Sequence, residues 1–231
     1  IYQSNTLGMI QILRDMDKPV FTQNDASLLS LFSNQVAITL ENSRLLNELQ
    51  ELAIHDPLTG VLNRRGFSEI AEREINVANR FDHELSIMFL DLDRFKEIND
   101  THGHAVGDQI LVGLATRCKN ILRSVDVICR YGGEEFVILL LESNLQAAIE
   151  IARRINNVVK LYPFHTDAGP INLTVSVGVA QYENHMNNIN VLINNADMAL
   201  YKAKSSGRDR VEAYIASEYP SNNKDFIGPH C

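Results

Sequence analysis

A short segment in the second half of the chain combines a tight turn with adjacent acidic side chains. The segment Arg130–Phe136 (RYGGEEF) places Gly132 and Gly133, followed by Glu134 and Glu135, between two apolar runs. Adjacent glycines permit a β-hairpin whose backbone can approach a ligand closely. Carboxylates beside a core are costly unless a cation or a proton compensates them. The motif taken alone also fits a Gly-Gly turn with solvated glutamates.

A second acidic pair follows an apolar run at Phe89–Lys96 (FLDLDRFK). The two-residue period of a strand puts Asp91 and Asp93 on one face and Leu92 on the other. A carboxylate at a strand end, a second at a nearby hairpin and a lysine such as Lys96 form the kind of site that binds Mg²⁺ with a triphosphate. The two acidic segments together therefore predict metal-assisted nucleotide chemistry.

A glycine-containing segment, Ile98–Asp108 (INDTHGHAVGD), comes next and suggests a loop that leads into a helix. Asp108 is either the N-cap of that helix or a ligand-binding residue. As ligands, Asn99 and Asp108 match the edge of guanine, because Asp accepts from N1–H and the exocyclic amine while Asn bonds O6 or N7. The sequence leaves both interpretations open.

Helices and strands alternate around these segments. We expect strands over 85–91, 171–181 and 210–214, a hairpin of 127–131 with 135–141, and helices over 64–80, 108–122, 145–162 and 191–205. This alternation with a central hairpin predicts an α/β (α+β) domain whose mixed central sheet is flanked by helices.

The N-terminal part has a different pattern. A strand is expected over Leu7–Leu13, a turn over 15–19, and a helix over 25–54 that contains neither Gly nor Pro. On that helix Ile38, Asn42, Leu45, Leu49 and Leu52 alternate in steps of four and three, which indicates a parallel two-stranded coiled coil. The alternative is one long helix that lies on its own domain.

Composition limits the class of protein. The chain has 231 residues, is 45% hydrophobic and carries a net charge of −8, which argues against a nucleic-acid-binding protein. No apolar stretch approaches the ~20 residues that cross a membrane, and no signal peptide begins at Ile1. Scattered cysteines indicate reduced thiols, with Cys118 and Cys129 in the core. We therefore expect a cytoplasmic protein without a membrane span, and a disordered tail over 216–231.

Five motifs in order resemble the GGDEF family of diguanylate cyclases. They are 55–65 (HDPLTGVLNRR), the DxD with its following FK, the ND…GH…GD segment, Gly132–Phe136 and 199–208 (ALYKAKSSGR). The resemblance spans roughly 52–214 and implies a cyclase domain over 55–215 with the cyclase and polymerase-palm-like GGDEF fold, whose active site includes the hairpin. The signature here is GGEEF, which keeps the carboxylate that the family's aspartate supplies.

The resemblance also implies a role for each matching residue. Metal ligands would be Asp91, Glu134 and the Leu92 carbonyl, which hold two Mg²⁺ (or Mn²⁺) ions per active half-site. Residues that bind the substrate GTP would be Lys96, Lys204 and Arg208 on the phosphates, Asn99 and Asp108 on guanine, and Gly132 and Gly133 at the turn. Glu134 would also deprotonate the attacking 3′-hydroxyl, with Glu135 and Lys96 beside it. Lys204 and Arg208 could instead be ordinary cations at a helix C-terminus.

The family's reaction needs two domains that face each other, each with one GTP. The 3′-oxygen of one GTP attacks the α-phosphorus of the other, pyrophosphate departs, and a second such step closes cyclic di-GMP. A homodimer through the 25–54 helix would therefore be part of the enzyme. Arg123 and Asp126 have the spacing of the family's RxxD inhibitory site for the product, and Arg154 falls where the family often has a second product-binding arginine. An Arg–Asp pair at a helix end can also be purely structural.

The first fifty residues or so resemble the end of a GAF sensory domain, so that 1–24 would be a remnant of it and 25–54 a signalling helix. The signal that such a sensor detects is not encoded in these residues. Two other functions compete with the cyclase. One is a catalytically silent module that binds cyclic di-GMP or GTP, and the other is a cyclase that makes mixed dinucleotides, against which Asp108 argues.

Overall fold

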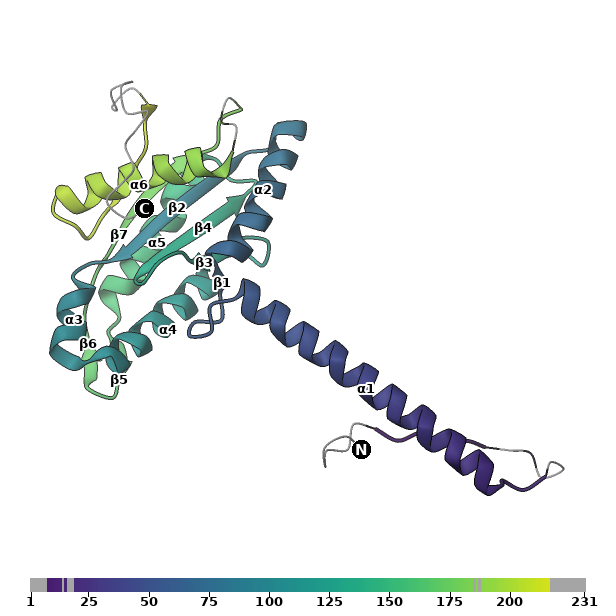
Figure 1. Cartoon of the computed structure of the whole chain (residues 1–231). Coiled ribbons are helices and arrows are strands. Elements are labelled where there is room, and N and C mark those ends of the chain that lie inside the picture. The colour runs from purple at the N-terminus through teal and green to yellow at the C-terminus, as the bar shows by residue number, and fades with distance from the viewer. Residues whose placement is uncertain (1–7, 14, 16–18, 185, 187, 217–231) are drawn as a thin grey trace. The chain divides into compact units, whose positions relative to one another are not determined.

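The computed structural model describes residues 8–13, 15, 19–184, 186 and 188–216, with side chains described except in 46–53 (Figure 1). The chain divides into two compact units, Ile1–Leu52 and Ala53–Cys231. No helix in the described part of the chain is long and apolar enough to span a membrane.

The N-terminal unit contains most of helix α1, Gln23–Ile54, which the uninterrupted periodicity predicts. Its start is capped reciprocally, because Thr22 N–H donates to Asp25 Oδ2 (2.8 Å) and Asp25 N–H donates to Thr22 Oγ1 (3.2 Å). The strand predicted over Leu7–Leu13 is wrong for its described residues, 8–13, which belong to no strand. A lone extended segment gains a strand's hydrogen bonds only beside a partner strand.

A six-stranded mixed sheet forms the centre of the second unit (Figure 1). Its order is β1-β3-β4-β2-β7-β8, with β1 and β3, and β7 and β8, paired in parallel and the other neighbours antiparallel. The strands are β1 Leu62–Asn63, β2 Leu85–Leu92, β3 Val127–Arg130, β4 Glu135–Leu141, β7 Val175–Gln181 and β8 Val211–Ala213. A separate hairpin pairs β5 Phe164–Thr166 with β6 Gly169–Ile171. The predicted mixed sheet flanked by helices is confirmed.

Five helices follow α1: α2 Arg64–Phe81, α3 Phe95–His102, α4 His104–Ile121, α5 Leu145–Leu161 and α6 Ile189–Ser205. Alternate residues of β2 enter two different hydrophobic clusters, as a period of two requires. Leu90 packs with residues of α4 and α5, whereas Phe89 packs with residues of α2 and α6. Figure 1 shows α2 and α6 on one face of the sheet and α5 on the other. The end of β2 therefore lies between two apolar layers.

Several boundaries differ from the sequence predictions. Residues expected to form a loop before Asp108 form α3, and Gly103 (φ 85°) separates α3 from α4 in a backbone conformation that favours glycine. Helix α4 begins at His104, so Asp108 lies inside it and the N-cap alternative is wrong. The strand predicted over 171–181 begins only at Val175. The predicted disorder of the tail falls on 217–231, outside the described residues.

Cys118 and Cys129 are buried, as predicted for core residues. Burial raises the pKa of the Cys118 thiol to about 12, although the neighbouring Arg117 charge opposes that shift. Burial likewise raises the pKa of Cys129. Neither thiol is therefore a nucleophile at neutral pH, because the reactive form is the thiolate.

Candidate functional site

The acidic signature and the strand-end aspartate lie side by side. The hairpin of β3 and β4 turns at Gly132 and Gly133, and Tyr131 N–H donates to the Glu135 carbonyl (2.8 Å). Strand β4 then pairs with β2 in a register that sets Glu135 directly opposite Asp91. Directly opposed residues of an antiparallel pair project from the same face. Two segments about forty positions apart in sequence thus bring two carboxylates together.

Lys204 of α6 supplies the positive charge beside them. Its Nζ lies 2.8 Å from Oδ2 of Asp91, a residue that is only 4% exposed. A buried carboxylate that faces a second one is unfavourable without such a cation. The structure therefore joins two residues that the resemblance assigned to the metal and to the phosphates, and Lys204 is more than a cation at a helix end.

The Arg130 side chain, from the last residue of β3, binds the turn that carries Glu134 and connects it to Asp56 outside the hairpin. Arg130 donates twice to the Gly133 carbonyl, from Nε (3.0 Å) and Nη2 (2.7 Å), and its Nη1 lies 3.2 Å from Oδ2 of Asp56. Asp56 in turn accepts from the N–H (2.9 Å) and the hydroxyl (2.6 Å) of Thr59. Burial raises the pKa of Asp56, but the donors from Thr59 and Arg130 outweigh it, so that its pKa is lowered.

Sequence reasoning gave Asp56 and Arg130 no role. Both stand inside motifs that the sequence made visible, but 74 positions separate them. The parallel pairing of β1 with β3 places the segment after α1 next to the hairpin. The available signal was that one motif contains an aspartate and the other an arginine, two side chains of opposite charge that can form an ion pair.

The absence of a side chain at Gly132 allows the Glu135 carboxylate to lie close to the turn. A Cβ built on it would lie 2.1 Å from Oε2 of Glu135. Any side chain there would displace the Glu135 carboxylate. The glycine therefore lets Glu135 fold back over the turn, next to Glu134, which is half-buried.

The two predicted guanine-binding residues lie on the paired helices α3 and α4. Asn99 is on α3, and its Oδ1 is buried without a hydrogen-bond partner among the described residues. A Cβ on Gly107 of α4 would lie 2.0 Å from that oxygen, so the Asn99 side chain packs directly against this glycine. Asp108 is exposed on α4, and Lys96 is exposed near the start of α3. A buried acceptor without a partner is the feature that a polar ligand would satisfy.

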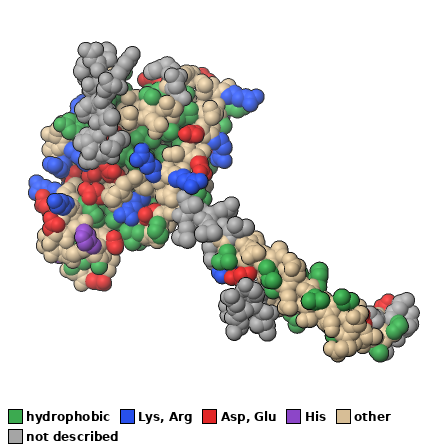
Figure 2. Space-filling view, viewed as in Figure 1, with side chains coloured by type: hydrophobic (Ala, Val, Ile, Leu, Met, Phe, Trp, Pro, Cys, Tyr) green, Lys and Arg blue, Asp and Glu red, His purple; other side chains and the backbone are tan. Residues whose placement is uncertain are grey.

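Arg208 lies three positions after the end of α6 and four positions beyond Lys204. It lines a cavity of about 390 Å³ together with Asp93, Arg94 and Glu97. Charged side chains of both signs are also interspersed on the visible face of this unit in Figure 2. The cavity is lined largely by polar and charged residues, and Gly207 and Asp209 from the loop after α6 are among them.

The described residues contain no cluster of three or more His, Cys, Asp or Glu side chains that could hold a metal ion by themselves. Mg²⁺ at a triphosphate site needs fewer protein ligands, because phosphate oxygens and water complete its coordination. Asp91 and Glu134 provide carboxylate oxygens, and Leu92 ends β2 between them in sequence. The donor set fits a hard cation that arrives with a nucleotide.

Arg123 and Asp126, the predicted product site, form a tight pair before β3. Arg123 N–H donates to Oδ2 of Asp126 (2.9 Å) and Nη2 donates to Oδ1 (3.1 Å). The same Nη2 also donates to the Leu141 carbonyl (2.6 Å) and to Oγ of Ser143 (2.9 Å). Arg154 is exposed on α5, and the ion pair described for Asp126 is with Arg123. The structure thus assembles two of the three residues.

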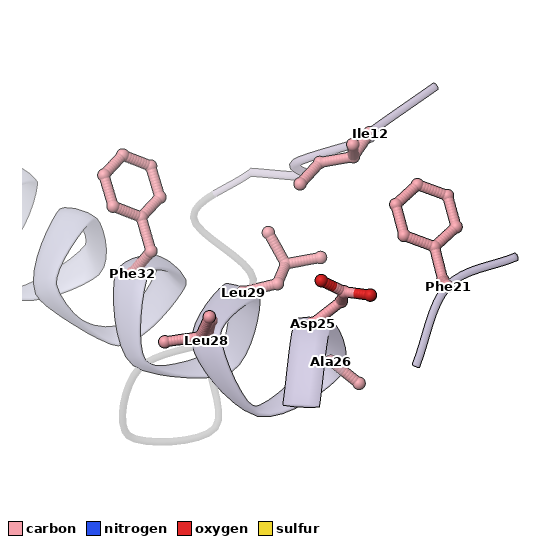
Figure 3. Close-up of a pocket in the computed structure, with 7 residues that line it drawn as sticks. All are labelled: Ile12, Phe21, Asp25, Ala26, Leu28, Leu29 and Phe32. Atoms are coloured by element: carbon pink, nitrogen blue, oxygen red, sulfur yellow. The ribbon is translucent and has the colours of Figure 1, made fainter. Parts of the chain in front are cut away.

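A larger cavity, of about 470 Å³, lies in the N-terminal unit. Figure 3 shows Ile12 and Phe21 from the segment before the helix and Leu28, Leu29 and Phe32 from α1. The one charged group that lines it is Asp25, which caps α1 through Thr22. The described residues that line this apolar cavity include no lysine or arginine that could bind a triphosphate.

A model of the family described as "Diguanylate cyclase, GGDEF domain" matches residues 53–210. The chain belongs to the GGDEF family. The match contains the strand-end Asp91, the hairpin and the loop after α6.

Curated relatives of this GGDEF domain are named as diguanylate cyclases. It is 39% identical over 167 residues to diguanylate cyclase DgcP of Pseudomonas aeruginosa, which covers 72% of this chain and 25% of that protein. It is 36% identical over 194 residues to diguanylate cyclase A of Treponema denticola, with 83% and 51% covered. Diguanylate cyclase DosC of Escherichia coli is 41% identical over 201 residues, with 84% and 44% covered. The chain thus spans between a quarter and half of these relatives.

Solved structures of GGDEF proteins share the fold. The coiled coil and GGDEF domain of DgcB from Caulobacter crescentus, in complex with c-di-GMP, aligns with a TM-score of 0.76 at 26% identity and covers 81% of this chain and 99% of that one. An active GGEEF domain of a diguanylate cyclase from Vibrio cholerae aligns with a TM-score of 0.63 at 31% identity, with 66% and 97% covered. The second relative has the same GGEEF signature as Gly132–Phe136.

Proposed function

We propose that this GGDEF domain is a diguanylate cyclase, which condenses two GTP molecules into cyclic di-GMP and releases two pyrophosphates. The observation that carries the proposal is the buried Asp91 carboxylate, 2.8 Å from Lys204 and opposite Glu135 at the Gly-Gly turn. Acidic oxygens for a metal and an ammonium for phosphates in one place are what a metal–triphosphate complex requires. Curated diguanylate cyclases at 36–41% identity support the same activity.

Guanine would bind between α3 and α4. The orphaned Oδ1 of Asn99 marks a polar contact that is still to be made, and the exposed Asp108 carboxylate can accept from two donors of the base. Lys96, Lys204 and Arg208 would bind the phosphates. Adenine lacks the two adjacent donors, so this pair of residues would select GTP.

The reaction centre would form at the ends of β2 and the hairpin. Asp91, the Leu92 carbonyl and Glu134 would hold two Mg²⁺ (or Mn²⁺) ions, which lower the pKa of the nucleophile and offset charge on the leaving group. Glu134 would accept the proton of the 3′-hydroxyl. Glu135 would support the site from beside it with a second carboxylate. As substrate arrives, Lys204 would move from Asp91 to the phosphates. Asp91 would then have a metal ion as its positively charged partner, and Lys204 would have a phosphate as its negatively charged one.

Two such domains must meet, and α1 is the proposed means. Its described apolar residues Ile38 and Leu45 are exposed, with the polar Asn42 between them on the same seam. Figure 2 shows hydrophobic side chains exposed along this helix. Exposed apolar residues at alternating steps of four and three are buried when two helices form a coiled coil. We assign 25–54 to a dimerising, signalling helix and the residues before it to the end of a GAF domain.

Product inhibition would act through Arg123, Asp126 and Arg154. The Asp126 side chain is 1% exposed while that of Arg123 is 51% exposed, so the arginine is anchored yet accessible to an anionic ligand. A guanine edge and a phosphate are the groups of cyclic di-GMP that such a pair can bind.

Incubation with GTP and Mg²⁺ tests the proposed activity. We expect two pyrophosphates per cyclic di-GMP, with the product identified by chromatography and mass. D91N should abolish product formation, whereas the control D100N, at an exposed position on α3, should not. Binding of GTP or cyclic di-GMP without any pyrophosphate release would favour a silent binding module instead.

A further inference from the structure

The two aspartates at the end of β2 have different partners. Asp91 contacts the ammonium of Lys204, whereas the carboxylate of Asp93, a residue that is 6% exposed, accepts hydrogen bonds from three neutral donors in the described part of the chain. Its Oδ1 accepts from the Ser176 hydroxyl (2.7 Å), and its Oδ2 accepts from the Thr174 hydroxyl (2.6 Å) and from the backbone N–H of Asp209 (3.1 Å). These donors occupy most of the carboxylate's acceptor sites. Asp93 therefore acts as a clamp between β7 and the loop after α6.

That loop has an unusual backbone. Gly207, Arg208 and Asp209 follow one another with φ values of 111°, 62° and 48°. For the two residues with a Cβ this left-handed conformation is unfavourable, and it persists only where the surroundings hold it. Here, hydrogen bonds with three other parts of the chain hold the loop in this conformation. Arg208 N–H donates to the Ala203 carbonyl (3.0 Å), Asp209 N–H donates to Asp93, and the Asp209 carboxylate accepts from Lys160 Nζ (2.5 Å).

Arg208, the middle residue of this loop, lines the charged cavity described above. Arg208 stands between a glycine and the clamped Asp209, and Asp93 lines the same cavity of about 390 Å³. The direction in which the Arg208 side chain leaves the backbone therefore depends on the position of the 207–209 loop. A loop that relaxed to ordinary helical or extended angles would point the guanidinium elsewhere.

We propose that Asp93, helped by the Lys160–Asp209 pair, is a positioning residue that holds Arg208 in place for the GTP phosphates. The inference rests on the proposed binding of GTP by this domain. Asp93 touches no substrate in this role and acts entirely through the backbone of the loop. Its effect on binding must then disappear when the Arg208 side chain is absent.

A double-mutant cycle tests this dependence. The measurement is equilibrium binding of a GTP analogue with a methylene α–β bridge, in the presence of Mg²⁺, to the full chain. R208A should weaken binding about tenfold, as expected for one lost charged contact. D93A should weaken binding by a similar factor alone, and by less than about twofold in the R208A background. D93N should recover most of the affinity, because an amide oxygen can still accept from Asp209 N–H while the NH₂ faces the Ser176 oxygen.

A less disruptive variant covers the case in which D93A does not fold. K160M removes the exposed partner of Asp209, and K119M, which changes a lysine in the corresponding last turn of α4, is its matched control. K160M should weaken analogue binding about threefold in the native background and leave R208A unchanged. Equal affinities of K160M and K119M, or additive losses for D93A and R208A, would overturn the inference. Absence of binding by the unmodified chain would instead refute the proposed function.

Discussion

Removal of the Arg130 side chain should loosen the catalytic turn from a position outside it. In the R130A variant the Gly133 carbonyl loses donors at 3.0 and 2.7 Å, and the Asp56 carboxylate loses a cation at 3.2 Å. Both side chains of the ion pair are only 16% exposed. The turn that carries Glu134 would then lose these side-chain contacts, while the hydrogen bonds from Tyr131 N–H and Gly132 N–H to the Glu135 carbonyl would remain. We therefore expect R130A to reduce both stability and activity.

The size of the stability effect follows from burial. Breaking a fully buried ion pair by removing one partner costs about 3–5 kcal/mol, whereas an exposed pair contributes about 0–1 kcal/mol. For this largely buried pair we expect a loss of about 2–3 kcal/mol in the free energy of unfolding. If the loosened turn displaces the Glu134 carboxylate by about 1 Å, the initial rate of pyrophosphate release should fall by roughly a hundredfold.

Urea unfolding and initial rates with saturating GTP measure these two effects. The matched control is R65A, because Arg65 pairs with Glu69 at the surface of α2 with side chains 74% and 59% exposed. R65A should change stability by less than about 1 kcal/mol. If R130A matches R65A in both assays, the pair with Asp56 does not position the turn.

The pH dependence of the same pair has a defined sign. The pKa of Asp56 is lowered in the folded protein, since donors from Thr59 and Arg130 outweigh its burial. Its stabilisation is therefore present above the unfolded pKa of about 3.9 and is lost as pH falls through the lower folded value. The stability difference between the native chain and R130A should be constant near neutral pH and shrink below about pH 4.

The remaining predictions concern the proposed site, its product and the helix. E134Q should abolish synthesis and leave the unfolding midpoint unchanged, and turnover within about tenfold of the native rate would contradict the metal role. D108A should weaken the use of GTP by roughly 1–3 kcal/mol in kcat/KM but not that of ATP, and equal losses would leave Asp108 without a role in base selection. R123A should remove the flattening of progress curves without a lower initial rate; the same plateau would refute product binding there. I38K combined with L45K should make the chain monomeric and inactive when dilute but not at high concentration, as sedimentation and rate measurements can show; a fully active monomer would reduce α1 to a spacer.

Local sequence patterns predicted most of the elements and the acidic centre. The apolar run before Asp91 and the Gly-Gly turn before Glu134 each identify a strand end from residues that are adjacent in sequence. An uninterrupted period similarly predicted α1. These features depend on backbone propensity and side-chain alternation within one segment, so a sequence contains them directly.

Short elements were not predictable in the same way. Strand β1, two residues long, exists only because it pairs with β3, and α3 fits between β2 and α4 although glycine-containing residues around it suggested a loop. Conversely, Gly8–Leu13 has a strand-like pattern but forms no strand, since a strand's hydrogen bonds require a partner. Tertiary pairing, rather than local propensity, decided these segments.

The sequence by itself determined which residue types are available for the chemistry: carboxylates at the ends of two strands, lysine and arginine after the last long helix, and glycines at the turn. Tertiary structure decided what each of them contacts. It paired Asp91 with Lys204. It also placed the nearby Asp93 where its carboxylate accepts a hydrogen bond from the backbone N–H of Asp209, 116 positions away. It also joined Asp56 to Arg130. Two aspartates two residues apart look equivalent in sequence, and they differ here because each contacts a different part of the chain that folding brings to the end of β2.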